Sequence, residues 1–479
     1  MSDAPFDPIS GADSEAAPSP DSLTDALGKL ALDGFGDDLG LDRNALASEL
    51  EHGLDQFNPV RMRGRVSRAV GLLVNASGVH ARLGEICELR TPGAPPMLAE
   101  VVGFARQTTL LTPLGATDGL SPSTEVIPSG RGHRFAVGAG LRGRVLNGLG
   151  SPLDGRGEIA GGTLVSAHNE PVNPLLRQNI DTPLATGVRA IDSLLTVGVG
   201  QRIGVFAPSG VGKSTLLGMI ARGTECDVIV IALVGERGRE VREFLEHSLS
   251  PEARGKAVIV ASTSDRPAME RVKSAHVATA IAEYFRDQGK RVLLLVDSLT
   301  RFARAQREVG LASGEPPTRR SFPPSTFSVL PQLLERAGQG ERGSITAFYT
   351  VLVEGDEETD PIAEEVRSIL DGHIVLSRKV ATANRYPAID VLASLSRVMS
   401  QVVGESHVSA AARVRELMSK YQDIELLVQI GEYREGTDPL ADAALRAKAP
   451  LDAFFSQRAD ALAPFNETLA TLHDIARRH

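Results

Sequence analysis

The pattern of apolar and polar positions changes twice along the body of the chain, which begins near Val60. From there to about residue 135, apolar residues fall in short β-like runs separated by Gly and Pro, such as ICELR, MLAEVVGFA and RFAVG. Strands this short and this closely spaced predict a small β-barrel or sandwich. We expect this barrel domain to span residues 59–135.

Residues 180–380 alternate strand-like and helix-like segments. RIGVFA, DVIVIALV, KAVIVA, RVLLLV and SITAFYTVL are almost wholly apolar, and segments such as KSTLLGMIARG lie between them. Runs without polar alternation are typical of parallel strands buried on both faces. The pattern predicts an α/β fold with a doubly wound parallel sheet over residues 136–390. The later spacing is mainly helical, which predicts a helical C-terminal domain over residues 391–479.

Charge sets the N-terminus apart from this body. Residues 1–60 contain 13 Asp and Glu against only Lys29 and Arg43, whereas the rest of the chain holds 47 acidic and 49 basic side chains. We expect residues 1–58 to be an acidic, partly disordered extension, either a solvated tail or a segment that folds on a partner. The nearly neutral body argues against a nucleic-acid partner.

Other bulk features indicate the cellular compartment. The chain has no apolar run long enough to span a membrane and no N-terminal signal pattern. Its two cysteines, Cys87 and Cys226, are too few for a disulfide scaffold or a cysteine-rich metal site. The sequence therefore predicts a cytoplasmic protein.

The octapeptide APSGVGKS, residues 207–214, matches the P-loop pattern G-x-x-x-x-G-K-[ST] except that Ala207 replaces the first Gly. An apolar strand precedes it and a helix follows, which is the order that a phosphate-binding loop requires. The first position lies where the strand ends, so a small residue should suffice. We expect Lys213 to reach the β- and γ-phosphates and Ser214 to bind Mg²⁺. The expected nucleotide-binding residues of this loop are Ala207, Pro208, Ser209, Gly210, Val211, Gly212, Lys213, Ser214 and Thr215.

Two acidic residues follow other apolar strands. Asp297 ends RVLLLVD and is interpreted as the Walker B ligand of Mg²⁺, although an Asp in this position can also be a helix cap. Glu236 in VGERGRE comes just after another strand, at the sheet edge where open α/β folds bind ligands. We interpret Glu236 as a catalytic base, with Arg237 beside it, rather than as part of a solvated turn.

These motifs together resemble those of a known family. With APSGVGKS and VGERGREVREF, the segments LLLVDSLTRFARAQRE, PPTRRSFPPSTFSVLPQLLERAG and YPAIDVLASLSRVM are similar to the secretion-ATPase branch of the rotary ATPase superfamily. Its members are the ATPases of type III secretion injectisomes and of flagellar export. The resemblance extends from about residue 60 to the C-terminus and excludes the acidic extension.

The resemblance implies a RecA-like core that hydrolyses ATP with Mg²⁺. It implies that Glu236 activates water, that Arg237 lies near phosphate and that Tyr386 stacks on adenine. It also implies that Arg397 is an arginine finger that reaches the γ-phosphate bound to a neighbouring subunit. Because one chain contains both the acceptor residues and the finger, the implied assembly is a homohexamer.

The resemblance also implies partners and a place in the cell. The partners are a stator or regulator protein, a central stalk protein and chaperone–effector complexes, with peripheral association to the export apparatus of the inner membrane. A role in an injectisome is favoured over one in flagellar export. A non-catalytic ring subunit would lack the carboxylate of the GER turn. An RNA-translocating hexamer should have stacking aromatics in its barrel, where only Phe104 and Phe135 occur between residues 60 and 135.

Overall fold

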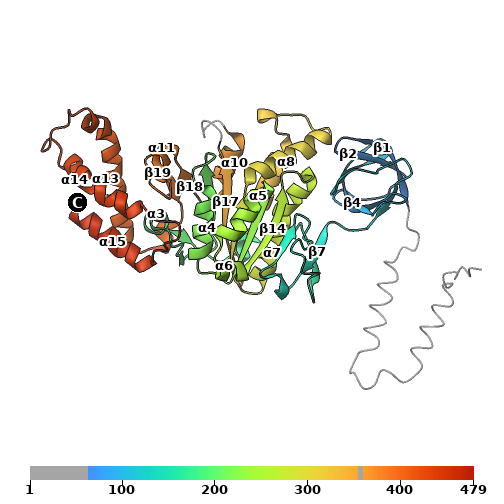
Figure 1. Ribbon diagram of the computed structural model, residues 1–479, viewed down its shortest axis with the longest axis horizontal. Coiled ribbons are helices and arrows are strands. Elements are labelled where there is room, and N and C mark those ends of the chain that lie inside the picture. Colours follow the sequence, from blue (N-terminus) through green and yellow to red (C-terminus); the bar gives the residue numbers. More distant parts are fainter. Residues whose placement is uncertain (1–62, 354–359) are drawn as a thin grey trace, which may run out of the picture. The chain divides into compact units, whose positions relative to one another are not determined.

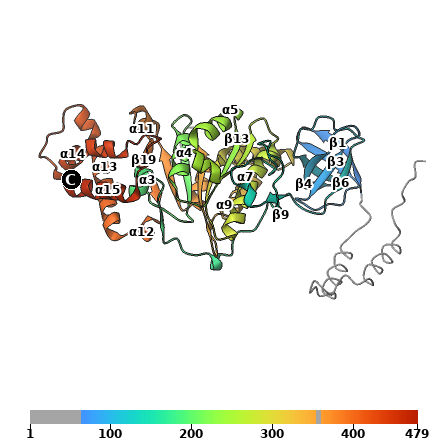
Figure 2. The same ribbon diagram turned by 60° about the horizontal axis from the view of Figure 1, so that its bottom comes forward.

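The computed structural model describes residues 63–353 and 360–479 (Figure 1). The predicted extension, residues 1–58, lies outside the described residues. Along the described chain a β-barrel precedes an α/β core, and the core precedes a group of helices (Figures 1 and 2). In this part of the chain no helix is both long and apolar enough to cross a membrane.

The first six strands form a closed antiparallel barrel in the order β1-β2-β5-β4-β3-β6. Alternate residues point inward and form a small core of their own, which includes Val74, Leu89 and Leu111. The barrel strands are β1 (Gly64–Val70), β2 (Leu73–Ser77), β3 (Ile86–Arg90), β4 (Met97–Ala105), β5 (Thr108–Pro113) and β6 (Glu125–Pro128).

The run RFAV was expected to belong to the barrel, and this expectation was wrong. It forms β7 (Arg134–Val137), which pairs with β9 (Thr163–Ser166) in a separate two-stranded sheet. The barrel is already closed by the pairing of β1 with β6, so it has no free edge for a seventh strand.

The core is a nine-stranded sheet in the order β19-β18-β12-β17-β15-β13-β14-β8, with β16 paired to β17. All pairs along this order are parallel except β18 with β19. The strands are β8 (Val145–Asn147), β12 (Arg202–Ala207), β13 (Val228–Glu236), β14 (Ala257–Thr263), β15 (Arg291–Asp297), β16 (Gly338–Gln339), β17 (Ser344–Leu352), β18 (Gly372–Leu376) and β19 (Ile389–Ser396).

Each face of this sheet is covered, which explains the apolar runs in the sequence. Along β13, Val230 and Ala232 belong to one core cluster, whereas Ile229 and Ile231 belong to the cluster on the opposite face. The predicted doubly wound sheet is thereby confirmed. The helices of this part are α3 (Arg189–Leu194), α4 (Lys213–Gly223), α5 (Gly238–Glu243), α6 (Pro251–Lys256), α7 (Ala268–Asp287), α8 (Leu299–Ala312), α9 (Pro324–Leu334), α10 (Pro361–Ile369) and α11 (Arg378–Thr382).

The C-terminal part is helical, as predicted. Its helices are α12 (Met399–Val402), α13 (Glu405–Gln429), α14 (Pro439–Phe455) and α15 (Phe465–Arg478). Strand β19 crosses the predicted domain bound at residue 390, so the core sheet continues to Ser396. Short elements complete the fold: η1 (Ala139–Leu141), η2 (Pro174–Leu176), η3 (Phe244–Ser248), η4 (Arg319–Ser321), β10 (Pro183–Leu184) and β11 (Val197–Gly198).

Candidate nucleotide site

The loop after β12 has the backbone of a phosphate-binding loop. Gly210 and Gly212 adopt φ angles of 84° and 94°, a region that favours glycine. Gly212 is the N-cap of α4, so the helix begins at Lys213 and directs its free N–H groups toward the loop. The loop therefore forms an anion-binding helix N-terminus.

Ala207 is the last residue of β12 and is fully buried. Its methyl group belongs to the core cluster on the α4 side of the sheet, and its carbonyl accepts a hydrogen bond from Val353 N at 3.1 Å. The position is an ordinary strand position that needs a small side chain. Its backbone does not need glycine, so Ala is compatible with a working loop.

Lys213 lies between two buried carboxylates. Its Nζ contacts Asp297 Oδ1 and lies 3.6 Å from Glu236 Oε1. The Lys213, Asp297 and Glu236 side chains are only 12%, 4% and 7% exposed, so water screens these charges weakly. Asp297 ends β15 and Glu236 ends the adjacent strand β13, and parallel pairing brings both to the carboxyl edge of the sheet. The structure thus brings these three predicted residues together.

Two residues of this cluster were missed in the sequence. Arg301, on the first turn of α8, donates from Nε to Glu236 Oε1 and from Nη2 to Glu236 Oε2, both at 3.0 Å. Thr350 in β17 donates from Oγ1 to Asp297 Oδ1 at 2.7 Å. The available signals were weak: a cation four residues after the Walker B candidate, and a threonine in a strand that also contains Ser344, Thr346 and Tyr349.

The arginine fits because of a glycine. Gly235 has a φ of 65° and lies at a bulge between β13 and β14, next to Glu236. A Cβ atom at Gly235 would lie 3.3 Å from Cδ of Arg301. Any larger residue would therefore both strain the backbone and press on the arginine that holds Glu236.

The surroundings of Glu236 suit proton transfer near neutral pH. Burial, and then the negative charge of Asp297, raise the pKa of Glu236 to about 7, while Lys213 and Arg301 oppose this rise. Glu240 on α5 is also hydrogen-bonded to Glu236, and this contact lowers the pKa of Glu240. A carboxylate with a pKa close to ambient pH is an effective general base.

Arg237 does not join this cluster within the chain. Its side chain is 71% exposed, and its Nη1 forms an ion pair with Glu240 Oε1 at 2.7 Å. The predicted position near phosphate therefore stays a prediction.

Tyr386 lies beside the loop. A Cβ atom at Gly212 would lie 3.8 Å from a ring carbon of Tyr386, and the side chain is half exposed. Its carbonyl accepts a hydrogen bond from Gln457 N at 2.7 Å, which ties this segment to the C-terminal helices. The ring is thus an available flat surface next to the phosphate-binding loop.

Arg397 lies at the opposite edge of the sheet. Its backbone N donates to Asp371 O at 3.0 Å, and Asp371 N donates to Arg202 O at 3.0 Å. Arg202 is the first residue of β12, whereas the phosphate-binding loop follows the last. Six strand residues separate these ends, or about 17 Å at the usual rise per residue. The structure does not bring exposed Arg397 to Lys213 of the same chain.

The residues fit a magnesium site that is completed by substrate. Asp297 and Ser214, which is exposed on the first turn of α4, offer the oxygen ligands that Mg²⁺ prefers. Among residues 63–353 and 360–479, no group of three or more His, Cys, Asp or Glu could hold a metal ion by itself. An ion held by two protein oxygens would need phosphate oxygens as well, which is the usual arrangement in ATPases.

Comparison with known proteins agrees with this site. Residues 187–396 match the nucleotide-binding domain of the ATP synthase alpha/beta family, and residues 66–130 match its beta-barrel domain. Residues 403–474 match the C-terminal domain of EscN ATPases of type III secretion systems. The fold and site therefore define the chain as an ATPase of the ATP synthase alpha/beta type.

Whole-chain relatives narrow the assignment. The type 3 secretion system ATPase of Xanthomonas euvesicatoria is 56% identical over 431 residues, covering 90% of this chain and 98% of the relative. The flagellum-specific ATP synthase of Bacillus subtilis (strain 168) is 49% identical over 421 residues, covering 88% and 96%. The chain belongs to the type 3 secretion ATPase family.

A solved structure shows the same architecture. The assembled ATPase EscN in complex with its central stalk EscO, from enteropathogenic E. coli, matches with a TM-score of 0.80 at 48% identity. The match covers 86% of this chain and all of that chain. The predicted order of barrel, RecA-like core and helical C-terminal domain is confirmed.

Proposed function

We propose that this chain hydrolyses ATP with Mg²⁺ in an injectisome, at active sites formed between identical subunits of a homohexamer. Lys213 binds the β- and γ-phosphates, and Ser214 and Asp297 hold Mg²⁺, which when bound neutralises phosphate charge. Tyr386 stacks on adenine, and Arg237 lies near phosphate. Glu236 accepts the proton of the attacking water, with its carboxylate oriented by Arg301.

The main support for this proposal is the distance between Arg397 and Lys213 within one chain. One chain supplies the loop, the base and the metal ligands at one edge of its sheet, and an exposed arginine at the other edge. Because Arg397 cannot reach the phosphates of its own chain, a neighbouring copy is needed to supply the finger. A head-to-tail contact of this kind forms a ring when the rotation between neighbouring subunits closes, as the proposed hexamer requires.

The proposed role extends to partners. By analogy with EscN, which was solved with a central stalk protein, a stalk protein would contact this ATPase. A stator or regulator and chaperone–effector complexes are further proposed partners, at the cytoplasmic face of the inner membrane. The identity to the type 3 secretion system ATPase of Xanthomonas euvesicatoria is 56%, against 49% to the flagellum-specific ATP synthase of Bacillus subtilis. This difference supports a role in an injectisome rather than in flagellar export.

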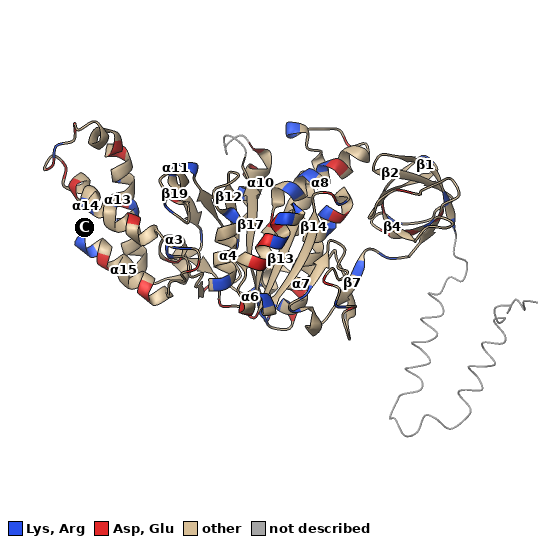
Figure 3. Ribbon diagram, in the orientation of Figure 1, with Lys and Arg blue, Asp and Glu red and all other residues tan. Residues whose placement is uncertain are grey.

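Nucleic acid is not a proposed partner. Lys and Arg are interspersed with Asp and Glu over the described elements, and they do not gather into a basic stripe (Figure 3). Phe104 is exposed, whereas Phe135 is buried and lies outside the closed barrel. Of these two aromatic residues, only Phe104 could therefore stack on a nucleic-acid base from the barrel. These features disfavour the RNA-translocating alternative.

Mixing of variants tests the shared site. Arg397→Ala and Lys213→Ala should each be inactive, whereas a one-to-one mixture should regain up to about a quarter of wild-type ATPase activity, because that share of interfaces joins two intact halves. The control mixture, Lys213→Ala with Glu236→Gln, should stay inactive because both variants lose the same half. The rate per subunit should also rise with protein concentration in parallel with mass by light scattering. An Arg397→Ala mixture that stays inactive at ring-forming concentration would contradict the shared site.

A further inference from the structure

The strand that leads to Arg397 contains a wide bulge. On either side of the bulge, β19 pairs regularly with β18: Leu395 pairs with His373, and Asp390 pairs with Val375. Between these two pairs, β18 has one residue, whereas β19 has the four residues Val391–Ser394. β19 is also the edge strand of the sheet. The backbone groups of the bulge must therefore find partners outside the regular ladder.

Arg415 of α13 provides such a partner. Its Nη1 donates to Val391 O at 2.9 Å, and its Nη2 lies 3.5 Å from Ser394 O. The same Nη2 donates to Leu194 O at 2.9 Å, at the C-terminal end of α3. Each of these partners is a backbone carbonyl rather than a carboxylate. Burial lowers the pKa of Arg415. One side chain thus joins the C-terminal helices, the bulge and the core.

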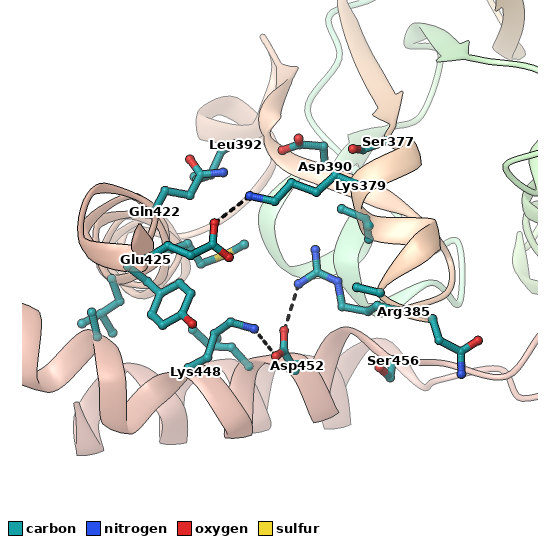
Figure 4. Close-up of a pocket in the computed structure, with 18 residues that line it drawn as sticks. Ser377, Lys379, Arg385, Asp390, Leu392, Gln422, Glu425, Lys448, Asp452 and Ser456 are labelled. Carbon is teal, nitrogen blue, oxygen red and sulfur yellow. Dashed lines mark hydrogen bonds and ion pairs between the residues drawn. The ribbon is translucent and has the colours of Figure 1, made fainter. Parts of the chain in front are cut away.

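Packing supports one side of the bulge only weakly. Asp390 and Leu392 line a cavity of about 260 Å³ between β19, α11 and the helices α13 and α14 (Figure 4). Ion pairs cross this space, such as Lys379 with Glu425 at 2.6 Å and Arg385 with Asp452 at 3.1 Å. No residue of the phosphate-binding loop lines the cavity. On this side the bulge therefore faces a cavity rather than closely packed side chains.

We propose that Arg415 is a positioning residue for Arg397. Ser394, at the end of the bulge, lies three residues before the finger, and bulges beside active sites redirect the side chains that follow them. By holding the carbonyls of the bulge, α13 fixes the direction in which Arg397 leaves the subunit. The C-terminal helices of one subunit then set the rate of hydrolysis at the neighbour's site. This inference rests on the proposed shared site.

The test uses the full-length chain and the readout of mixed rings. Arg415→Met keeps the length and apolar part of the side chain but removes the donors. We expect its ATPase rate to fall on the order of tenfold to a hundredfold, since misplacing a catalytic group by about 1 Å can have such an effect. ATP affinity should stay close to wild type, and the melting temperature should fall only modestly, because the carbonyls of Val391 and Leu194 lose their donor. Arg413→Met is the matched control on the same helix, because Arg413 contacts Glu416 and the C-terminal residue and not β19.

The mixtures assign the defect to one half of the site. Arg415→Met mixed with Lys213→Ala should regain about as much activity as Arg397→Ala does with Lys213→Ala. Mixed with Arg397→Ala, it should gain nothing. If Lys213→Ala fails to rescue Arg415→Met but rescues Arg397→Ala, or if Arg397→Ala rescues Arg415→Met, the inference is wrong. If Lys213→Ala fails to rescue Arg397→Ala itself, the shared site is wrong instead.

A second variant covers the case in which Arg415→Met does not fold. Ser394 Oγ donates to Asp390 O and accepts from Val375 N at 2.9 Å, so it holds the opposite side of the bulge. Ser394→Ala should show the same pattern of rescue as predicted for Arg415→Met. A Ser394→Ala chain that binds ATP normally but is rescued only by Arg397→Ala would overturn the proposal.

Discussion

Arg301 holds both carboxylate oxygens of Glu236 through a two-pronged ion pair, with each N–H···O contact at 3.0 Å. Such pairing fixes the plane of the carboxylate as well as its position. Arg301 belongs to α8, which starts directly after the strand that delivers Asp297. The proposed base and the proposed metal ligand are thus oriented by one strand–helix unit.

Replacing Glu236 should separate binding from hydrolysis. Glu236→Gln keeps the shape and one acceptor for Arg301 but cannot take a proton. We expect the ATPase rate to fall about 10²–10⁴-fold. The Kd for ATP should change by less than about threefold, because a tenfold change would need the loss of about 1.4 kcal/mol of binding free energy. Glu243→Gln, on the exposed face of α5, is the control. A Glu236→Gln protein that no longer binds ATP would indicate a structural role.

Activity should depend on pH through Glu236. Its pKa is raised to about 7, and only the deprotonated form can accept a proton. Below pH 7, kcat/KM should therefore fall about tenfold per pH unit, and above it should level off. Steady-state rates from pH 5.5 to 8.5 measure this profile, with protein stability followed in parallel. A flat profile between pH 6 and pH 8 would argue against Glu236 as the base.

Removing Lys213 should affect stability as well as activity. Lys213→Ala leaves the buried Asp297 without its lysine partner, whereas Glu236 keeps its ion pair with Arg301. Breaking a buried ion pair in this way costs about 3–5 kcal/mol. Hydrolysis should fall to background. Urea unfolding of the nucleotide-free protein measures the loss of unfolding free energy. Lys379→Ala is the control, because Lys379 is 74% exposed and its ion pair with Glu425 should contribute little to stability. Near-normal turnover in Lys213→Ala would refute the phosphate-binding role.

A buried histidine group should make the protein sensitive to acid. Burial and the nearby charge of Lys273 lower the pKa of His168 to about 3 and that of His133 to about 4. Because the unfolded chain takes up protons on these imidazoles below about pH 6.5, whereas the folded chain does not, stability falls as the pH falls. From pH 7 to pH 5 the loss is roughly 2 kcal/mol for each histidine.

The contacts of His168 allow a matched test of this sensitivity. His168 Nε2 lies 2.7 Å from Lys273 Nζ, so a neutral acceptor is needed at this position. His168→Gln keeps an acceptor that does not titrate, and it should reduce the pH dependence of the free energy of unfolding. His80→Gln, at an exposed barrel position, should not. Equal slopes for wild type and His168→Gln would contradict this account.

The core and its loop could be predicted because buried parallel strands leave a clear sequence pattern. Strands covered on both faces give unbroken apolar runs, and residues at their carboxyl ends must meet at one edge of the sheet. Glu236 and Asp297 were predicted in this way, and Lys213 was predicted from the P-loop pattern. Arg301 was missed because a charged residue on a partly exposed helix is usually part of a solvated face, and only the folded structure shows which carboxylate it meets.

Other features had no local signal. Strand β8 has only three residues and pairs with β14 more than a hundred positions later in the chain, so neither length nor periodicity marks it. The bulge in β19 depends on the register of two strands. The roles of Tyr386 and Arg397 were predicted from the family resemblance alone, since an isolated tyrosine or arginine in a sequence has many possible roles.

The position of β8 limits how the chain can be divided. Val145–Asn147 pairs with β14 and forms one edge of the core sheet, although it precedes the family match to the nucleotide-binding domain, which starts at residue 187. A recombinant fragment that begins at residue 187 would lack β8 and leave β14, in which six of seven residues are buried, as an open edge strand. Such an edge promotes self-association. A fragment intended for crystallisation or screening should therefore begin before Val145, even when only the ATPase core is wanted.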